Sequence, residues 1–156
     1  MRARGFTLIE IAVVLAIVAI LASMALPLAN LANTRAKEED LRRALREIRS
    51  AIDAYKRAYD DGRMLARVGA SGYPPDLEVL VNGVEDVKSP SRRRIYFLRR
   101  LPRDPFYPDN SRQAAETWGK RAYASPPDDP SDGEDVYDVY SLSPRRGING
   151  VPYRQW

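Results

Sequence analysis

Residues 5–29 read GFTLIEIAVVLAIVAILASMALPLA, and this stretch decides how the chain is organised. Between positions 11 and 26, Ser23 is the one residue that is neither apolar nor small. As a helix, residues 6–29 would extend over about 36 Å, which is enough to cross a bilayer. Arg2 and Arg4 come before this stretch with no acid beside them. The sequence therefore predicts one membrane-spanning helix with its N-terminus in the cytoplasm and the rest of the chain exported.

Glu10 is the informative residue of this segment. A carboxylate at the centre of an apolar span costs about 2.5–3.5 kcal/mol on insertion scales, so a partner must compensate for it. The run Arg4-Gly5-Phe6-Thr7-Leu8-Ile9-Glu10 resembles the leader junction of type IV prepilins, which has a short basic leader, then Gly and Phe, with Glu as the fifth residue of the mature chain.

This resemblance implies that residues 1–5 are a leader, which a membrane aspartyl peptidase removes between Gly5 and Phe6. The new Phe6 amine would then be N-methylated. In the family, the resulting ammonium pairs with the acid at the position of Glu10 in a neighbouring subunit, and this pairing sets the axial register of a filament. A proline at the position of Pro27 is common in pilins, where we expect it to let the helix bend or melt locally.

Two other interpretations of the segment stay open. The first is an ordinary secretory signal with a cleavage site after Ser23-Met24-Ala25, and the second is a generic single-span anchor. Neither explains an acid at Glu10 or the Gly5-Phe6 junction.

Composition narrows the class of protein. The chain has 156 residues with no Cys and no His, which excludes thiolate or imidazole metal sites, disulfides and any nucleophile–histidine pair. The formal charge is +4, from 25 Lys and Arg against 21 acids, and removal of Arg2 and Arg4 leaves 23 against 21. A nearly neutral mature chain gives little support for nucleic-acid binding.

Residues 30–62 are expected to continue the helix in amphipathic form. Apolar residues recur at spacings of three and four, at Leu41, Leu45, Ile48, Ile52, Tyr55 and Tyr59. The stripe is shorter than three heptads and ends in tyrosines, which favours packing inside the chain over a coiled coil. Asp61-Gly62 should end the helix.

Residues 63–156 are expected to form a periplasmic globular part. Eleven of the twelve prolines lie beyond Tyr73, so long helices are not expected there. Short helices are predicted over 76–81 and 91–101, and strands over 120–125, 136–142 and 151–156. The predicted fold is α+β, with a long N-terminal helix packed on a three- or four-stranded antiparallel sheet.

This part also resembles the major pseudopilin of type II secretion. The matching pieces are Leu101–Phe106, Trp118-Gly119, Asp138–Leu142 and Trp156, with the insertion 107–117 as a departure. In the family, the loop after the Tyr-Ser-Leu strand is acidic and holds calcium. Here it reads Ser143-Pro144-Arg145-Arg146-Gly147, which would repel a cation, so no cofactor is expected from that loop.

Two charged clusters need separate interpretations. The acids Asp128, Asp129, Asp132, Glu134 and Asp135 could bind a hard cation but lack the spacing of a calcium loop, so a solvated turn is favoured. The basic run is Arg92, Arg93, Arg94, Arg99, Arg100 and Arg103, interrupted by Tyr96 and Phe97. It is suited to acidic subunits or lipid headgroups, with nucleic acid as the less favoured partner.

The resemblance implies a structural, non-enzymatic subunit of a type II secretion pseudopilus in the bacterial inner membrane, assembled into a periplasmic filament. Its partners would be other copies, other pseudopilins, the prepilin peptidase and N-methyltransferase, and the inner-membrane assembly platform. The alternative is a major or minor type IV pilus subunit for adhesion, motility or DNA uptake. A membrane-tethered hydrolase that uses two carboxylates is a third possible class, but no arrangement of Asp and Glu in the sequence suggests a catalytic cleft.

Overall fold

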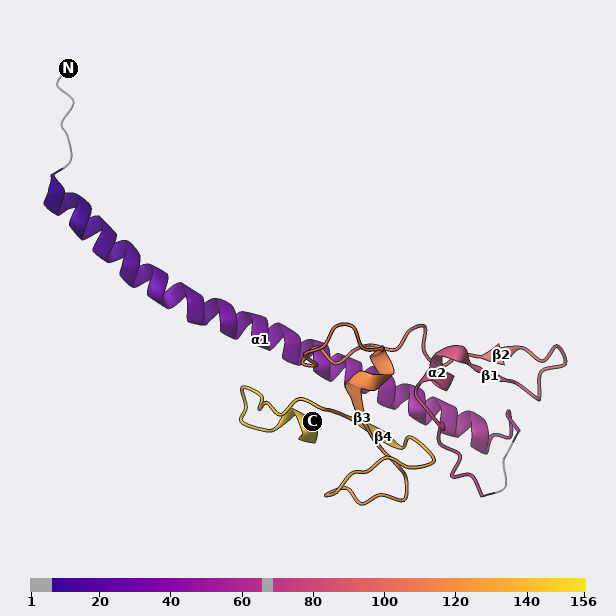
Figure 1. Cartoon of the computed structure of the whole chain (residues 1–156). Helices are drawn as coiled ribbons and strands as arrows, with labels where there is room; N and C mark the ends of the chain where they lie inside the picture. Colours follow the sequence, from indigo (N-terminus) through magenta and orange to yellow (C-terminus); the bar gives the residue numbers. More distant parts are fainter. Residues whose placement is uncertain (1–6, 66–68) are drawn as a thin grey trace. The chain divides into compact units, whose positions relative to one another are not determined.

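The computed structural model describes residues 7–65 and 69–156 (Figure 1). Internal contacts divide the chain into two compact units, Met1–Ala36 and Lys37–Trp156. The helix α1, Leu8–Asp60, supplies residues to both units. Every other element belongs to the second unit.

The part of α1 from residue 35 to residue 58 is rich in the helix formers Ala, Leu, Arg, Lys and Glu. Residues 8–20 contain many Ile and Val, which are weaker helix formers, but a helix satisfies the backbone hydrogen bonds of such an apolar run internally. Pro27 lies inside α1 and does not end it. The helix ends as predicted at Asp60, where Gly62 adopts φ +64° and its amide donates to the Tyr59 carbonyl at 2.9 Å. Glycine takes this left-handed conformation without the steric cost that a Cβ would add.

The second unit adds short elements to the end of α1. These are α2 (Glu78–Asn82), β1 (Val84–Glu85), β2 (Arg94–Ile95), the 3₁₀ turn η1 (Ala114–Thr117), β3 (Trp118–Arg121), β4 (Asp138–Ser141) and the 3₁₀ turn η2 (Tyr153–Gln155). Two antiparallel pairs result, with Val84 opposite Ile95 and with Trp118 opposite Ser141. The α+β class is thereby confirmed.

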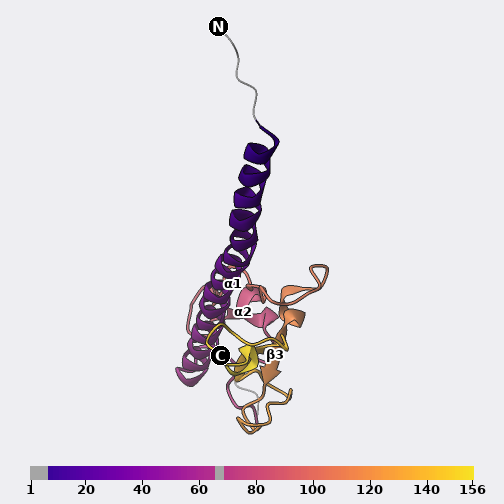
Figure 2. The ribbon, with the colours of Figure 1, turned by 90° about the vertical axis from the view of Figure 1, so that its left-hand side faces the viewer.

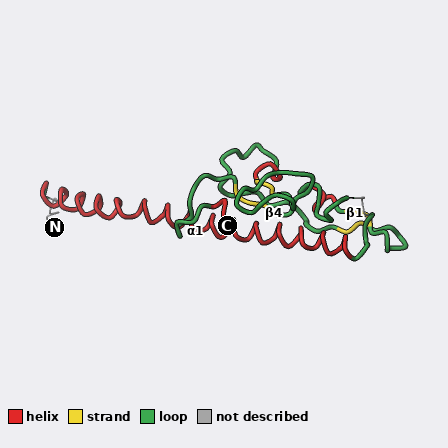
Figure 3. Tube along the Cα trace, turned by 90° about the horizontal axis from the view of Figure 1, so that it is seen from below, coloured by secondary structure: helices red, strands yellow, loops and turns green. Residues whose placement is uncertain are grey.

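The apolar stripe of α1 forms the core of the second unit. Leu41, Leu45, Ile48, Ile52 and Tyr55 are buried, against Val139 of β4 and Tyr153 of η2 among others. Figures 1 and 3 show this part of α1 alongside the loops and strands, and Figure 2 shows α2 and β3 to one side of it. The stripe packs inside the chain, as its short length and terminal tyrosines indicated.

Two predicted elements, the strand over 151–156 and the helix over 91–101, were wrong. The C-terminal strand over 151–156 is instead an isolated bridge between Arg146 and Pro152 followed by η2, because Pro152 has no N–H for a ladder. The helix over 91–101 is replaced by β2 and a turn, since the amides of Phe97 and Leu98 both donate to the Leu80 carbonyl.

The predicted single sheet of three or four strands is also wrong. The described residues contain two separate two-stranded sheets. The hairpin of β1 and β2 was not expected, because two-residue strands are too short to show alternation in sequence. The short helix over 76–81 is confirmed as α2.

Candidate functional site

The N-terminal end of α1 is closed by a capping box. The Thr7 hydroxyl accepts the Glu10 amide at 3.3 Å, and Glu10 Oε2 accepts the Thr7 amide at 3.3 Å. The Thr7 carbonyl accepts the first helical hydrogen bond, from Ile11, at 3.2 Å. This reciprocal arrangement satisfies two N–H groups that a helix start leaves without partners. The Thr-x-x-Glu spacing is the sequence signature of this box, which we did not predict.

The first unit exposes its apolar surface on all sides. Side chains from Leu8 to Ser23 are exposed, and the Ser23 hydroxyl donates to the Ile20 carbonyl at 2.7 Å, so its polar group is satisfied within the helix. Among helices in the described part of the chain, α1 is the one long and apolar enough to cross a membrane. A helix that is apolar all round needs lipid or neighbouring helices around it.

The predicted site residues have different outcomes. Glu10 is exposed and has no cationic partner within residues 7–65 and 69–156. Gly5 and Phe6, where we predicted cleavage and N-methylation, lie outside the described residues. Pro27 lies inside α1, and its role in helix flexibility stays a prediction.

Glu38 is a residue whose importance the sequence concealed. The spacing of Glu38 and Arg42 is that of a surface ion pair on a helix, yet Glu38 is only 4% exposed. Its Oε1 accepts the Ile148 amide at 2.7 Å and the Tyr153 hydroxyl at 3.0 Å, while Oε2 lies 3.8 Å from Arg42. This one carboxylate therefore holds the C-terminal segment on α1.

Aromatic rings complete this attachment. Tyr153 stacks on Phe106 with ring centroids 4.1 Å apart, and Trp156 meets Tyr153 edge-on at 4.9 Å. The Arg42 guanidinium lies 4.4 Å from the Trp156 ring centroid. Burial and the hydrogen bond to Glu38 raise the pKa of Tyr153 to about 12, so its hydroxyl remains a donor at neutral pH.

Arg49 makes a second attachment about three turns further along α1. Its Nε donates to Asp138 Oδ1 at 2.7 Å, and its Nη2 donates to the carbonyls of Val139 at 3.1 Å and Trp156 at 2.8 Å. One guanidinium thus connects α1, β4 and the C-terminal segment. Its rigid fork of donors suits such a three-way contact.

The motifs that resemble the pseudopilin sequence come together around this attachment. Trp118 Nε1 donates to the Pro102 carbonyl at 2.9 Å. A Cβ on Gly119 would lie 2.3 Å from the Tyr140 ring, so only glycine fits there. The buried Asp104 accepts the Ser141 hydroxyl at 2.5 Å. Segments separated in sequence are therefore parts of one packed unit.

Asp104 yields a prediction about pH. Burial raises its pKa, although hydrogen bonds from Ser141 and the Phe106 amide oppose that effect. The pKa of Asp104 in the folded state is above its unfolded value of about 3.9, so the folded state binds the proton more tightly. The contribution of Asp104 to stability therefore falls as the pH rises from the unfolded pKa through the folded pKa. We expect wild type to gain stability relative to Asp104→Asn as the pH is lowered from neutral toward about 4.

Denaturant unfolding of the detergent-solubilised chain, followed by near-ultraviolet circular dichroism, measures this difference. The contributions of the other carboxylates to the pH dependence are the same in both proteins, so they cancel in the difference. As a control, Asp104→Ala leaves the Ser141 and Phe106 donors without an acceptor and should cost about 2 kcal/mol at neutral pH. A loss of wild-type stability relative to Asp104→Asn on acidification would contradict the prediction.

The calcium loop of the resembling family does not fit this chain. Residues 141–156 contain no Asp or Glu. The Arg145 guanidinium lies 5.4 Å from the Phe106 ring centroid, and Arg146 Nη1 donates to the Gly150 carbonyl at 3.1 Å. Calcium needs six to eight oxygen ligands, whereas two carboxylates that contact this segment already accept hydrogen bonds from it: Glu38 from Ile148 and Tyr153, and Asp104 from Ser141.

Most of the acidic cluster faces solvent. Asp128, Asp129, Asp132 and Glu134 are exposed, and no three acidic side chains of the described residues converge on a point that could hold a metal. Asp135 is used differently, since it accepts the Ser71 hydroxyl and the Tyr123 amide.

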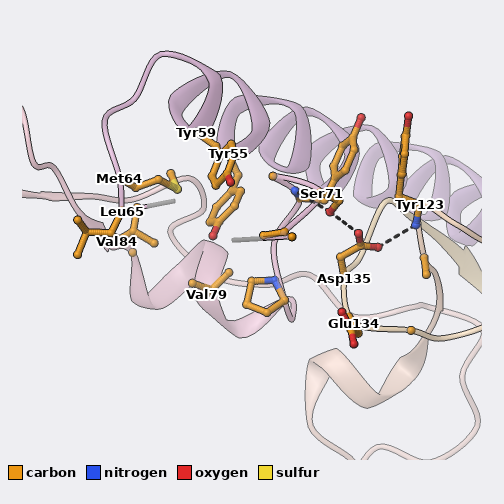
Figure 4. A pocket seen from close by; sticks show the side chains of 18 of the residues that line it. Tyr55, Tyr59, Met64, Leu65, Ser71, Val79, Val84, Tyr123, Glu134 and Asp135 are labelled. Atoms are coloured by element: carbon orange, nitrogen blue, oxygen red, sulfur yellow. Dashed lines mark hydrogen bonds between the residues drawn. The ribbon is translucent and has the colours of Figure 1, made fainter. Parts of the chain in front are cut away.

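A cavity of about 1230 Å³ in the second unit lies beside this cluster (Figure 4). Several tyrosines line it, among them Tyr55, Tyr59 and Tyr123, and Asp135 links Ser71 to the Tyr123 backbone at one end. The cavity therefore presents aromatic surface. The hydrogen bonds of Asp135 connect the loops that carry Ser71 and Tyr123.

Comparisons with known proteins found a family motif and a relative. Residues 1–26 match the family described as the prokaryotic N-terminal methylation motif. The chain is 36% identical over 112 residues to the type II secretion system core protein G of Dickeya chrysanthemi, a match that covers 67% of this chain and 64% of the relative. The chain thus spans less than two thirds of that relative's length. No solved structure matches the chain.

The N-terminal methylation motif and the long apolar helix α1 are features that this chain shares with pilin-like proteins. Together, the two matches support the pseudopilin and type IV pilin-like family for this chain.

Proposed function

We propose that the chain is a structural subunit of a type II secretion pseudopilus. Residues 1–5 are a leader that a prepilin peptidase removes between Gly5 and Phe6, and the Phe6 amine is then methylated. Residues 6–29 anchor the subunit in the inner membrane, and residues 30–62 continue the helix. Residues 63–156 form the periplasmic part.

The observation that carries this proposal is the exposed apolar surface of α1 with one acid at its start. The membrane accommodates the apolar side chains before assembly, and the helices of neighbouring subunits accommodate them afterwards. Glu10 cannot be left alone in either place, so pairing with the Phe6 ammonium of a neighbour fixes the register of the filament.

The globular part supports the same role. Glu38 and Arg49 fasten the C-terminal segment to the helix, so that a load applied to α1 is carried by side-chain contacts with the periplasmic part. The sequence contains no G-x-x-x-x-G-K-[ST] loop. An assembly ATPase in the cytoplasm therefore supplies the energy for filament growth, and the chain acts as a building unit.

Two measurements test the proposal. N-terminal sequencing and mass spectrometry of the membrane-bound chain should find a methylated Phe6 as the first residue. A first residue at Leu26 would indicate a secretory signal and one at Met1 an uncut anchor, and either result would overturn the proposal. Deletion of the gene should leave exoproteins in the periplasm, whereas lost motility or DNA uptake would identify a type IV pilus subunit instead.

A further inference from the structure

The segment 93–100 carries four exposed arginines on a rigid support. Arg93, Arg94, Arg99 and Arg100 are exposed, while Phe97 and Leu98 turn toward the core. The amides of Phe97 and Leu98 donate to the Leu80 carbonyl at 3.0 and 2.9 Å, and the Phe97 ring lies 5.3 Å from Tyr55. We call this segment the arginine surface.

Most of this charge has no partner among the residues that the structure describes. Arg94 donates to the Gly83 carbonyl at 2.9 Å. Arg93, Arg99 and Arg100 make no ion pair or side-chain hydrogen bond with any residue of 7–65 or 69–156. Between them lies Tyr96, which is 64% exposed. Arginine and tyrosine are the residue types enriched at protein interfaces.

A second surface carries the opposite charge. The loop 126–135, called the acidic loop, presents Asp128, Asp129, Asp132 and Glu134 to solvent without ion pairs to other described residues. Three of its residues are prolines. The Ser131 carbonyl accepts the Ala122 amide at 3.0 Å, and its amide donates to the Ser125 hydroxyl at 3.0 Å. The loop is therefore ordered before any contact forms, which lowers the entropy cost of binding.

We infer that the arginine surface of one copy docks on the acidic loop of the next copy in the filament. Four arginines meet four carboxylates, and each copy carries one surface of each sign. Such a contact joins different patches on the two partners, so it repeats from head to tail, as a filament requires. An anionic lipid or a nucleic acid would be attracted to the arginines but repelled by the acidic loop.

This inference rests on the proposed function and adds the contact between periplasmic parts. Charge complementarity steers association and sets register more than it adds affinity. The contact would therefore act together with the apolar helix, which supplies the larger attraction. Filament growth should then be sensitive to salt, since exposed ion pairs are screened within about 8 Å at physiological ionic strength.

Charge reversal tests the contact in cells that assemble the full-length chain. One variant carries Arg93→Glu, Arg99→Glu and Arg100→Glu, and another carries Asp128→Lys, Asp129→Lys and Glu134→Lys. We expect each to reduce the yield of sheared filaments at least tenfold, with an unchanged thermal unfolding midpoint because the replaced side chains are exposed and unpaired. A chain with both sets should return to within about threefold of wild type.

Co-expression of the two single-set variants shows that the contact is between copies. One variant presents two negative surfaces and the other two positive surfaces, so alternating copies are complementary and filaments should reappear. If only the arginine reversal reduces the yield, or if neither the combined chain nor co-expression restores it, the contact is overturned. Loss from the arginine set alone would point to a lipid or nucleic acid.

The controls separate this inference from the proposed function. A wild-type chain that forms no filaments overturns the proposed function and the contact with it. Wild-type filaments, together with reversal variants that assemble equally well, overturn the contact and leave the proposed function in place.

Discussion

Replacing Glu10 with leucine is expected to abolish filament assembly while the chain stays in the membrane. Leucine makes the segment more apolar, so insertion should not suffer. If Glu10 pairs with a neighbour as proposed, the change leaves the Phe6 ammonium of that neighbour without a counter-charge in apolar surroundings, at a cost of about 3–5 kcal/mol per contact. We therefore expect at least about a hundredfold less filament, measured by shearing and immunoblotting against an unchanged amount of membrane-bound chain.

Thr7→Ala is the matched control, because Glu10 also caps the helix through Thr7. Loss of a cap costs about 1 kcal/mol and leaves the carboxylate in place. Filaments of Thr7→Ala should form at near wild-type yield if Glu10 acts through register. An equal loss in both variants would show that Glu10 acts as a local cap, and normal filaments from Glu10→Leu would contradict its role altogether.

Glu38→Ala is expected to cost about 3 kcal/mol of unfolding free energy. The change removes the acceptor of the Ile148 amide and of the buried Tyr153 hydroxyl, and it removes the partner of Arg42. Each hydrogen bond to a charged group contributes about 1.5–3 kcal/mol, and donors left buried without acceptors add a desolvation cost. Denaturant unfolding in detergent, followed through the near-ultraviolet signal of Trp118 and Trp156, measures the loss.

Two variants show whether burial is the cause. Glu38→Gln keeps an oxygen acceptor but loses the charge, so about 1–2 kcal/mol is expected. Glu39→Ala removes an exposed acid of the next position, whose ion pairs to Arg42 and Arg46 are 3.9 and 3.7 Å long, and should cost about 0.5 kcal/mol or less. Equal losses in Glu38→Ala and Glu39→Ala would mean that the C-terminal segment does not depend on the buried carboxylate.

Much of the fold could be predicted because it rests on local patterns. The apolar run, the stripe from Leu41 to Tyr59 and the glycine at position 62 are each visible within a few turns of sequence, and α1 follows all three. The two sheets were less predictable. Their strands are two to four residues long, so the alternation of apolar and polar residues has too few positions to identify them.

The residues of the candidate site also fall into those that the sequence predicts and those that it does not. Gly5, Phe6 and Glu10 form a motif that the sequence shows directly, and the match over residues 1–26 covers it. Glu38 gave a misleading signal, because Glu-x-x-x-Arg is the pattern of a surface pair on a helix. Its burial depends on Ile148 and Tyr153, more than a hundred residues away in the chain.

By itself, the sequence determined the class of protein, the apolar segment, the lone acid within it and the length of the helix, because these depend on the chain's neighbours within one or two turns. Tertiary structure alone decided that Glu38 is buried, that Arg49 joins three segments and that most charges of the arginine surface and the acidic loop have no ion pair among the described residues. The physical reason is that a side chain's energy depends on what surrounds it. For these residues the surroundings come from distant parts of the chain, which no local pattern records.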